Sequence, residues 1–392
     1  MRTVTTLRTV ALLTSAALLT ALFLRAEDAG LPSGEFRIQL PLGISAEIWS
    51  YFVPRDNPMT AAKVELGRRL FFDKRLSVDG SVSCATCHNP KLAYTDARVR
   101  AEGVYGRRGV RNTPTLLNAM FQSGQFHDGR ALSLEAQAKL PLINPLEMGN
   151  ESHLQLVARL QSIPEYSANF LQVFHHPATI EALSKAIAAF ERTLVSGNSP
   201  FDRFTAGDKD AMGEAAQRGF AVFRGRGRCS VCHAFNEAFP FFSDRTYRNT
   251  GVSGNSAVFE PLAIQARELV RRTSPAAGLQ QLAQKEGASE LGRFLVTGHS
   301  LDIGAFKIPS LRDVELTAPY FHDGSAKTLA DVLHFYIQGG KSSFNRDWEV
   351  QGISLTEGEQ SDLIEFLKSL TSDDTRRMSN YESRNLSVVS GP

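Results

Sequence analysis

The spacing of apolar residues along the chain predicts a mainly α-helical protein. Apolar positions recur at helical spacing in five stretches, residues 65–72, 180–194, 216–223, 329–337 and 363–370. Thr356 and Glu359 have the spacing of a capping box before the last stretch, and Gly339-Gly340 ends the fourth. The alternating pattern of a half-buried strand is sparse. We therefore expect helices to build the core.

The N-terminus has the composition of an export signal. Arg2 and Arg8 precede an apolar run over residues 10–24, which has the length of a signal peptide and is short for a transmembrane helix. We expect residues 1–28 to be a signal peptide that directs the protein to the periplasm. An uncleaved membrane anchor is the alternative, because large residues stand where a cleavage site prefers small ones.

Length and charge restrict the remaining possibilities only broadly. The 392 residues are 42% hydrophobic, which is enough for two domains. With 43 basic and 41 acidic residues the net charge is +2, so no global excess of charge points to a nucleic acid partner. Residues 29–59 carry four prolines and are expected to be extended, and residues 372–392 are polar and are expected to form a flexible tail.

All four cysteines belong to two copies of one motif. The copies are Cys84, Cys87 and His88, and Cys229, Cys232 and His233. In a Cys-x-x-Cys-His run, the thiols can form thioethers with the vinyl groups of one haem, and the histidine can ligate its iron. Disulfides or a thiolate zinc site would leave both histidines unexplained. The sequence therefore predicts two covalently bound c-type haems.

A second similarity runs through the chain at a constant offset of 195 residues. Without a gap, Phe126-His127-Asp128-Gly129 falls on Phe321-His322-Asp323-Gly324. Self-similarity of this kind indicates a duplicated unit, and each copy here contains one haem motif. We expect two related cytochrome c-like domains, residues 29–198 and 199–371.

The second copy is longer between its haem motif and this segment. His88 and Pro114 are 26 residues apart, whereas His233 and Pro309 are 76 apart. The extra residues, roughly 244–300, include six arginines. A solvated loop is the default expectation, and a surface that docks a partner or binds haem propionates is the alternative.

The repeat also bears on the second axial ligand of each haem iron. Subtracting 195 from Tyr336, on the apolar stripe of the expected helix 329–337, gives Pro141. A tyrosine can ligate iron and a proline cannot, so one haem would be closed and the other open to a small molecule. The alternative is that Tyr336 is an ordinary core aromatic. Glu147 follows Pro141 in an apolar setting, where burial would raise its pKa and suit it to move a proton, although a surface or capping glutamate is the alternative.

Several runs resemble the bacterial dihaem cytochrome c peroxidase family, which includes MauG-type enzymes that oxidise residues of another protein. The resemblance covers about residues 60–370 and rests on the haem motifs together with Leu70 to Ser77, Arg111 to Thr115, Phe126 to Arg130, Glu147 to Gly149 and Leu316 to Gly324. It implies that the N-terminal haem is the peroxide site and that the C-terminal haem transfers electrons. It also implies a catalytic role for Glu147, with Gln137 as a nearby polar residue of the same pocket.

The resemblance further implies one Ca²⁺ between the domains. Asn112 would bind it through its side chain, and Thr317 and Pro319 through backbone carbonyls. Tyr336 stands where many cytochrome c peroxidases have a methionine ligand and where MauG has tyrosine, and a phenolate ligand lowers the reduction potential. Val104 is aligned with the distal histidine that closes the N-terminal haem in some peroxidases, so we expect that haem to be open in the diferric protein.

His127 departs from the family pattern, which has tryptophan at this position between the haems. Histidine is a poorer one-electron relay, so either charge sharing between the haems is altered or His127 only supports the fold by hydrogen bonding. We expect a periplasmic, hydrogen-peroxide-dependent oxidoreductase that oxidises aromatic residues of a partner protein. A peroxide scavenger fed by a small cytochrome or cupredoxin is one alternative, and a non-catalytic dihaem electron carrier is the other. Trp49 and Trp348 are each either an exit point for oxidising equivalents or ordinary packing residues.

Overall fold

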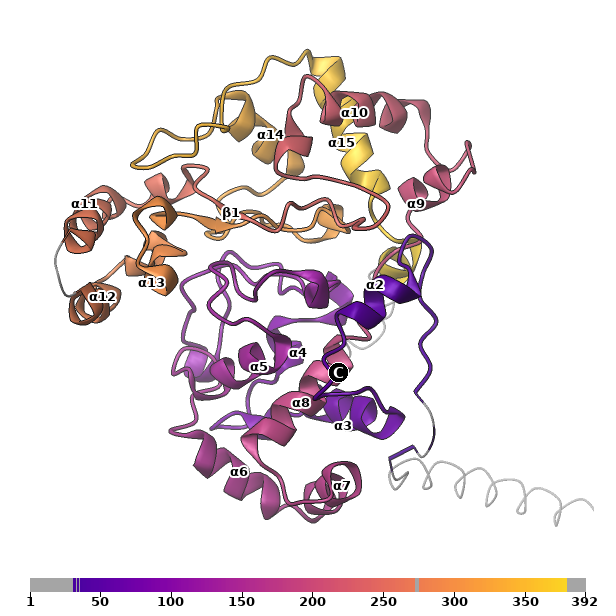
Figure 1. Ribbon diagram of the computed structural model, residues 1–392, viewed down its shortest axis with the longest axis vertical. Helices are drawn as coiled ribbons and strands as arrows, with labels where there is room; N and C mark the ends of the chain where they lie inside the picture. Colours follow the sequence, from indigo (N-terminus) through magenta and orange to yellow (C-terminus); the bar gives the residue numbers. More distant parts are fainter. Residues whose placement is uncertain (1–30, 33, 35, 272–274, 379–392) are drawn as a thin grey trace, which may run out of the picture.

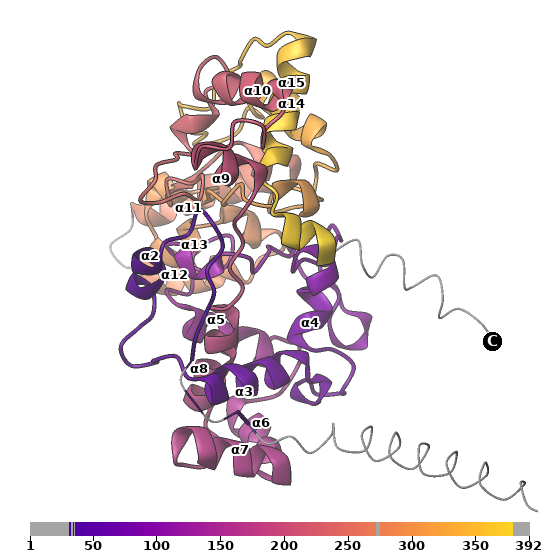
Figure 2. The same ribbon diagram turned by 90° about the vertical axis from the view of Figure 1, so that its right-hand side faces the viewer.

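The computed structural model describes residues 31–378, apart from 33, 35 and 272–274. Within these residues the fold is mainly helical, as predicted, and its parts form two lobes that stack along the long axis of the molecule (Figures 1 and 2). The expected signal peptide lies outside the described residues. No helix among the described residues has the length and apolar character needed to cross a membrane.

The lobe at the bottom of Figure 1 is built from the N-terminal half of the chain. Its helices, with α2 beside the other lobe, are α2 (Ala46–Tyr51), α3 (Ala61–Phe72), α4 (Cys84–Cys87), α5 (Leu134–Ile143), α6 (His153–Gln161), α7 (Pro164–Phe174) and α8 (Ile180–Glu191). Its short 3-10 helices are Lys74–Leu76, Pro90–Leu92, Val104–Gly106 and Ala119–Phe121. The expected extended segment 29–59 therefore contains one short helix, α2, which Ser45 caps by accepting a hydrogen bond from the Ile48 N–H.

The other lobe contains the second haem motif. Its α-helices are α9 (Pro200–Thr205), α10 (Glu214–Arg224), α11 (Phe259–Val270), α12 (Pro275–Ala283), α13 (Phe294–Thr297), α14 (Leu329–Ile337) and α15 (Glu357–Ser369). Its 3-10 helices are Cys229–Val231, Val252–Asn255, Ala288–Leu291, Ser300–Asp302 and Val314–Leu316. Strands β1 (Tyr247–Arg248) and β2 (Phe306–Lys307) pair antiparallel, with Tyr247 opposite Lys307.

One close helix pair occurs in each lobe, and a glycine permits it. Gly67 of α3 lies against the carbonyl oxygen of Ala186 on α8, and Gly219 of α10 lies against that of Asp362 on α15. A Cβ on either glycine would overlap that oxygen. The two lobes therefore use the same device to bring α3 against α8 and α10 against α15.

Replacing Gly219 by alanine is expected to lower the free energy of unfolding by about 1–3 kcal/mol, because the two helices must separate to accommodate a methyl group. Chemical denaturation measures the change. Gly213→Ala is the matched control, since nothing lies within 4 Å of a Cβ built there. Equal stability of the two variants would contradict the overlap.

The segments related by the 195-residue offset have the same backbone conformation. Phe126 and Phe321 both adopt positive φ (64° and 68°), as do Asn118 and Asp313 (59° and 58°). The isolated bridges Gln125 to Ala131 and Tyr320 to Ala326 also correspond. These are the similarities that two related domains would show.

The same offset relates the contacts between the two lobes. The backbone N–H of Asn112 donates to the carbonyl of His322 (2.9 Å), and that of Lys307 donates to the carbonyl of His127 (2.7 Å). Asn112 corresponds to Lys307 and His127 corresponds to His322. The lobes thus meet in a reciprocal contact with approximate two-fold symmetry.

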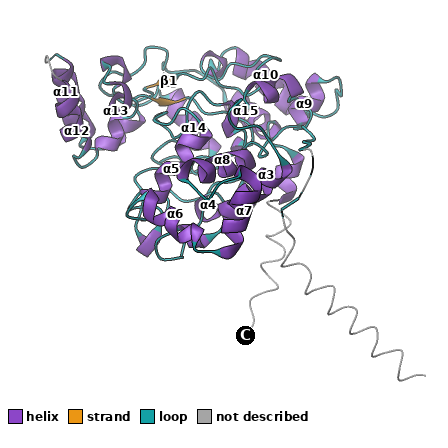
Figure 3. Ribbon diagram, turned by 60° about the horizontal axis from the view of Figure 1, so that its bottom comes forward, coloured by secondary structure: helices purple, strands orange, loops and turns teal. Residues whose placement is uncertain are grey.

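The described part of residues 244–300 forms a folded unit, so the expectation of a solvated loop is wrong. Helices α11, α12 and α13 stand together on one side of the upper lobe (Figures 1 and 3). Their apolar faces meet in a core of their own that includes Phe259, Leu291 and Phe294, each with no exposed surface. The Arg293 guanidinium donates to the carbonyl of Gly129 (2.8 Å). The insertion is therefore bound to the N-terminal lobe.

The first residues of the expected C-terminal tail are folded. Residues 373–378 are helical, and Thr375 is buried at 2% exposure. The Arg376 guanidinium pairs with Glu315. Of the expected tail 372–392, only residues 379–392 lie outside the described part of the chain.

Candidate active site

A single cavity of about 970 Å³ extends between the two lobes. Its lining includes nearly all the site residues predicted from the sequence: Cys84, Cys87, His88, Asn112, His127, Gln137, Glu147, His233, Thr317, Pro319 and Tyr336. Cys229 and Cys232 are the two predicted residues that do not line it. Cys229 packs at the edge of the phenylalanine-rich C-terminal core. The fold therefore gathers residues from both halves of the chain around one space.

The two motif histidines are held in the same way. The Nδ1–H of His88 donates to the carbonyl of Tyr94 (3.1 Å), and that of His233 donates to the carbonyl of Phe242 (2.9 Å). A carbonyl oxygen only accepts, so Nδ1 carries the proton and Nε2 keeps its lone pair. This is the tautomer that an iron-ligating histidine requires.

The cysteines also fit covalent haem attachment. None of the four forms a disulfide, and within the described residues no three His, Cys, Asp or Glu side chains gather in a way that suits a metal ion. The disulfide and zinc alternatives therefore have no support in the geometry. Cys84, Cys87 and both oriented imidazoles line the cavity. Each motif keeps two free thiols beside its histidine, which fits one c-type haem per lobe.

Glu147 lies in the N-terminal part of the cavity. Its side chain accepts a hydrogen bond from Asn144 Nδ2 (2.8 Å), and Met148 beside it is buried. Burial raises the pKa of Glu147, whereas the nearby Arg130 guanidinium and the Asn144 hydrogen bond lower it. The result is a carboxyl group poised to exchange a proton with a molecule in the cavity.

Pro141 and Tyr336 occupy equivalent places on equivalent helices. Helices α5 and α14 begin at Leu134 and Leu329, which are related by the 195-residue offset. Pro141 and Tyr336 both line the cavity. Burial raises the pKa of Tyr336, so its phenolate form would need a cation such as a haem iron to compensate the charge.

Val104, the residue aligned with the distal histidine of some peroxidases, is buried beside the cavity. Its side chain has no exposed surface and belongs to the hydrophobic core of the N-terminal lobe, outside the cavity lining. Its backbone N–H donates to the carbonyl of Glu147 (2.8 Å), so Val104 is next to the candidate acid–base residue. In the described residues, the histidines that do line the cavity are His88, His127, His233 and His322.

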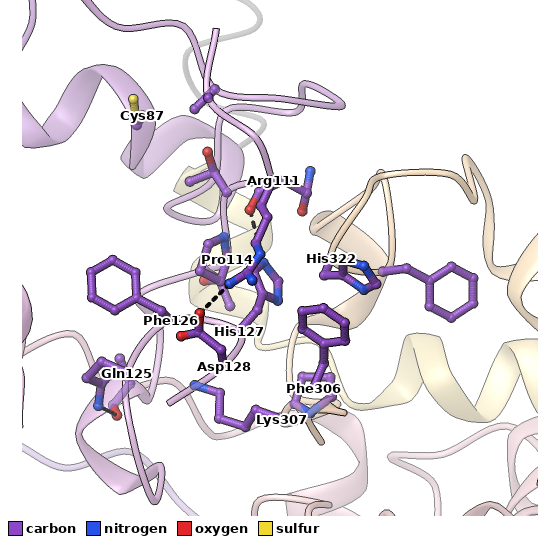
Figure 4. Close-up of a pocket in the computed structure, with 18 of the residues that line it drawn as sticks. Cys87, Arg111, Pro114, Gln125, Phe126, His127, Asp128, Phe306, Lys307 and His322 are labelled. Carbon is purple, nitrogen blue, oxygen red and sulfur yellow. Dashed lines mark hydrogen bonds and ion pairs between the residues drawn. The ribbon is translucent and has the colours of Figure 1, made fainter. Parts of the chain in front are cut away.

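His127 lies where the two lobes meet, beside a group of charged residues (Figure 4). Its Nε2–H donates to the carbonyl of Asn112 (3.0 Å). Burial, with the Arg111 charge as the next cause, lowers the pKa of His127 to about 3, so the ring is neutral at physiological pH. Arg111 forms an ion pair with Asp128 (2.6 Å). This environment keeps His127 a neutral hydrogen-bond donor.

The predicted calcium residues have a mirror image in the other lobe. Subtracting 195 from Thr317 and Pro319 gives Gln122 and Gly124, and adding 195 to Asn112 gives Lys307. The Lys307 ammonium donates to the carbonyl of Gly124 (2.8 Å). Burial lowers its pKa to about 8, which still leaves it charged at pH 7. On that side of the approximate two-fold axis, a side chain supplies the positive charge.

On the other side Asn112 is neutral, and its amide nitrogen donates to the carbonyl of Arg98 (2.7 Å). The Oδ1 atom keeps its lone pairs, and backbone carbonyls and amide oxygens are ligands that Ca²⁺ accepts. The donor set therefore fits a hard cation at the place where the mirror site has an ammonium group.

Three charged residues of this region, Glu191, Glu290 and Lys307, were missed by sequence reasoning. Glu191 lines the cavity near Cys84, and burial raises its pKa to about 8, with Oε2 unpaired. The His322 ring donates to Glu290 (2.9 Å) and stacks on Phe306 with ring centroids 3.6 Å apart. Lys307 is the third. Of the three, only Glu191 could have been found from the sequence, because it is a charged residue on the apolar face of the predicted helix 180–194.

Comparison with known proteins identifies the family. The profile described as "Di-haem cytochrome c peroxidase" matches residues 61–210. The methylamine utilization protein MauG of Methylorubrum extorquens is 38% identical over 322 residues, which span 82% of this chain and 81% of that protein. The chain belongs to the dihaem cytochrome c peroxidase family. As a member of that family it is an oxidoreductase with haem cofactors.

The family includes relatives named MauG and relatives named cytochrome c peroxidase. The cytochrome c551 peroxidase of Nitrosomonas europaea is 36% identical over 317 residues, covering 81% of this dihaem peroxidase and 82% of the relative. A crystal structure of a MauG-like protein associated with microbial copper homeostasis superimposes with a TM-score of 0.68 at 31% identity, over 82% of this chain and 93% of that one. Similarity to these relatives therefore does not decide whether this dihaem peroxidase carries out the MauG-type reaction or peroxide scavenging.

Proposed function

We propose that this dihaem peroxidase is a MauG-type enzyme that uses hydrogen peroxide to oxidise aromatic residues of a partner protein. The observation that carries the proposal is the difference between the lobes: Tyr336 lines the cavity shared with His233, and Pro141 takes its place in the N-terminal lobe. A phenolate ligand favours oxidised states of a haem, whereas a closed methionine-ligated haem favours acceptance of electrons from a small donor.

Bound haem supplies redox-active iron that takes up the oxidising equivalents of peroxide. The chain supplies the acid–base chemistry. Glu147 accepts a proton from peroxide and returns it to the departing oxygen, while Asn144 holds the carboxylate by its hydrogen bond. Gln137 on α5 lines the same cavity and can orient peroxide. Overall, one peroxide, two protons and two electrons give two water molecules, and the partner supplies the electrons.

The experiment that tests the proposal adds one equivalent of hydrogen peroxide to the diferric protein without prior reduction. Optical and EPR spectra should show rapid loss of a high-spin ferric signal and a long-lived oxidised protein. No reaction until one haem is reduced would overturn the proposal in favour of a reductively activated peroxide scavenger fed by a small cytochrome or cupredoxin. Membership of a peroxidase family already argues against the third alternative, a non-catalytic electron carrier.

We further propose that the protein acts in the periplasm. Thioether attachment of haem takes place outside the cytoplasm in bacteria, and residues 1–28 have the composition of an export signal. Fractionation of cells that express the full chain, with detection of covalent haem in the periplasmic fraction, tests this assignment. Apoprotein retained in the cytoplasm would contradict it.

The mirror relation to Lys307 supports a Ca²⁺ bound by Asn112, Thr317 and Pro319. Removing calcium with a chelator is expected to lower the unfolding temperature, because a ligand present at about 100 times its Kd stabilises the native state by ~2.7 kcal/mol. Asn112→Ala should abolish this difference. Identical thermal unfolding of the wild-type protein with and without calcium would contradict the site.

A further inference from the structure

The loop between α14 and α15 carries the more exposed of the chain's two tryptophans. Trp348 is 75% exposed, on a loop that runs along the outer edge of the upper lobe (Figure 1). Trp49 is partly buried against an interlobe apolar cluster, and its indole N–H donates to the carbonyl of Arg192 (3.1 Å). Packing accounts for Trp49. An exposed tryptophan needs no explanation by itself, but the loop that carries this one is held by ion pairs on both sides of it.

The residue after Trp348 is tied to the start of the second haem motif. Glu349 accepts a hydrogen bond from Arg228 Nη2 (2.8 Å). Arg228 directly precedes Cys229, the first haem-attachment residue. A path of covalent bonds and one charge-assisted hydrogen bond therefore leads from the tryptophan to one end of the motif.

The residue before Trp348 is tied to the other end. Asp347 pairs with Arg248 Nη1 (3.1 Å), and Arg248 Nη2 also pairs with Asp244 (3.0 Å). The backbone N–H of Asp244 donates to the carbonyl of Cys232 (2.8 Å). Two ion-paired connections thus fix the loop on both sides of Trp348 to the residues that attach the C-terminal haem.

We propose that Trp348 is the residue through which electrons enter the enzyme from its protein substrate. The inference rests on the proposed function and names the surface that function uses. Tryptophan is among the most easily oxidised side chains. Trp348 gives one electron inward to the oxidised C-terminal haem, and an aromatic side chain of the partner then refills it. Two such transfers balance one hydrogen peroxide: the partner loses two electrons and two protons, and peroxide gains them to form two water molecules.

Tyr51 is the rival exit point. It is 82% exposed and begins a series of aromatic rings whose centroids are 5.2, 5.4 and 4.2 Å apart, through Phe52, Phe121 and Phe241. Phe241 precedes Phe242, whose carbonyl accepts from His233. Phenylalanine rings are far harder to oxidise than tryptophan or tyrosine, so this series offers no intermediate stopping point for an oxidising equivalent.

The test adds peroxide to the diferric holoenzyme without any partner and maps the oxidised residues by peptide mass spectrometry over time. The variants are Trp348→Phe, with Trp49→Phe and Tyr51→Phe as matched controls. In the wild-type protein we expect one or two oxygen atoms to be added first at Trp348. In Trp348→Phe that product is lost, and the oxidised protein should persist about tenfold longer. The two control variants should behave like the wild-type protein.

The outcomes separate the two proposals. If peroxide is consumed without a donor but oxidation appears first at Tyr51 or Trp49, the function stands and the role of Trp348 is wrong. If peroxide is consumed only with a reduced small c-type cytochrome, the proposed function is wrong. The inference is then decided by the rate of cytochrome oxidation: about tenfold slowing in Trp348→Phe supports entry at Trp348, and an unchanged rate overturns it.

Discussion

Replacing Glu147 by glutamine is expected to slow the reaction with hydrogen peroxide by about 10²–10⁴-fold, the usual contribution of a positioned general acid–base group. Glutamine keeps the size of the side chain and its contact with Asn144, but it cannot accept and return a proton. Stopped-flow measurement of the spectral change under excess peroxide gives the rate constant. Glu151→Gln is the matched control, because Glu151 is the next glutamate in the chain and is exposed.

The pH dependence gives an independent check on the same residue. Glu147 must be ionised to accept a proton from peroxide, so the wild-type rate should fall as the pH drops through its pKa. Burial raises that pKa above the ordinary value of 4.5, which moves the fall toward neutral pH. Glu147→Gln should lack this limb. A wild-type profile that is flat through the acid range would contradict the assigned role.

Replacing Tyr336 by phenylalanine should open the C-terminal haem. The substitution keeps the ring in its place on α14 and removes the only atom that can ligate iron. We expect a second high-spin ferric signal by EPR, and oxidation of the partner protein slowed by about 100-fold, equivalent to ~2.7 kcal/mol of barrier. The reaction of the N-terminal site with peroxide should persist.

Tyr320→Phe provides the control for that experiment. Tyr320 lines the same cavity, but its hydroxyl donates to the carbonyl of Val314 (3.0 Å). Its loss should therefore leave both EPR signals unchanged. An unaltered spectrum in Tyr336→Phe would show that Tyr336 is only a core aromatic, and the proposed function would lose the observation that carries it.

The sequence predicted best where a local pattern alone determines the structure. Helices with a full apolar stripe, such as α8 and α15, lie where the periodicity placed them, and the Thr356 to Glu359 capping box is formed. Cys-x-x-Cys-His is similarly self-contained, because its chemistry needs no distant residue. The repeat pointed to Tyr336, and the apolar setting and the family resemblance pointed to Glu147; both residues line the cavity.

The rest depends on contacts between distant segments. No local pattern shows that residues 244–300 contribute to the cavity lining, since their apolar faces pack mainly on one another and Arg293 binds the opposite lobe. The hydrogen bond from Lys307 to the carbonyl of Gly124 likewise joins residues that are far apart in the chain, so no local pattern predicts it.

The reciprocal hydrogen bonds between the lobes have a consequence for how such an enzyme can diverge. Each half presents to the other the surface that it receives, through His127 and Lys307 on one side and His322 and Asn112 on the other. That is the contact of a symmetric dimer, here contained in one polypeptide. Covalent linkage frees the two members of each pair to differ, as Pro141 and Tyr336 do. A homodimer would have to accept every substitution in both subunits, whereas in this chain the surroundings of each motif histidine can change independently.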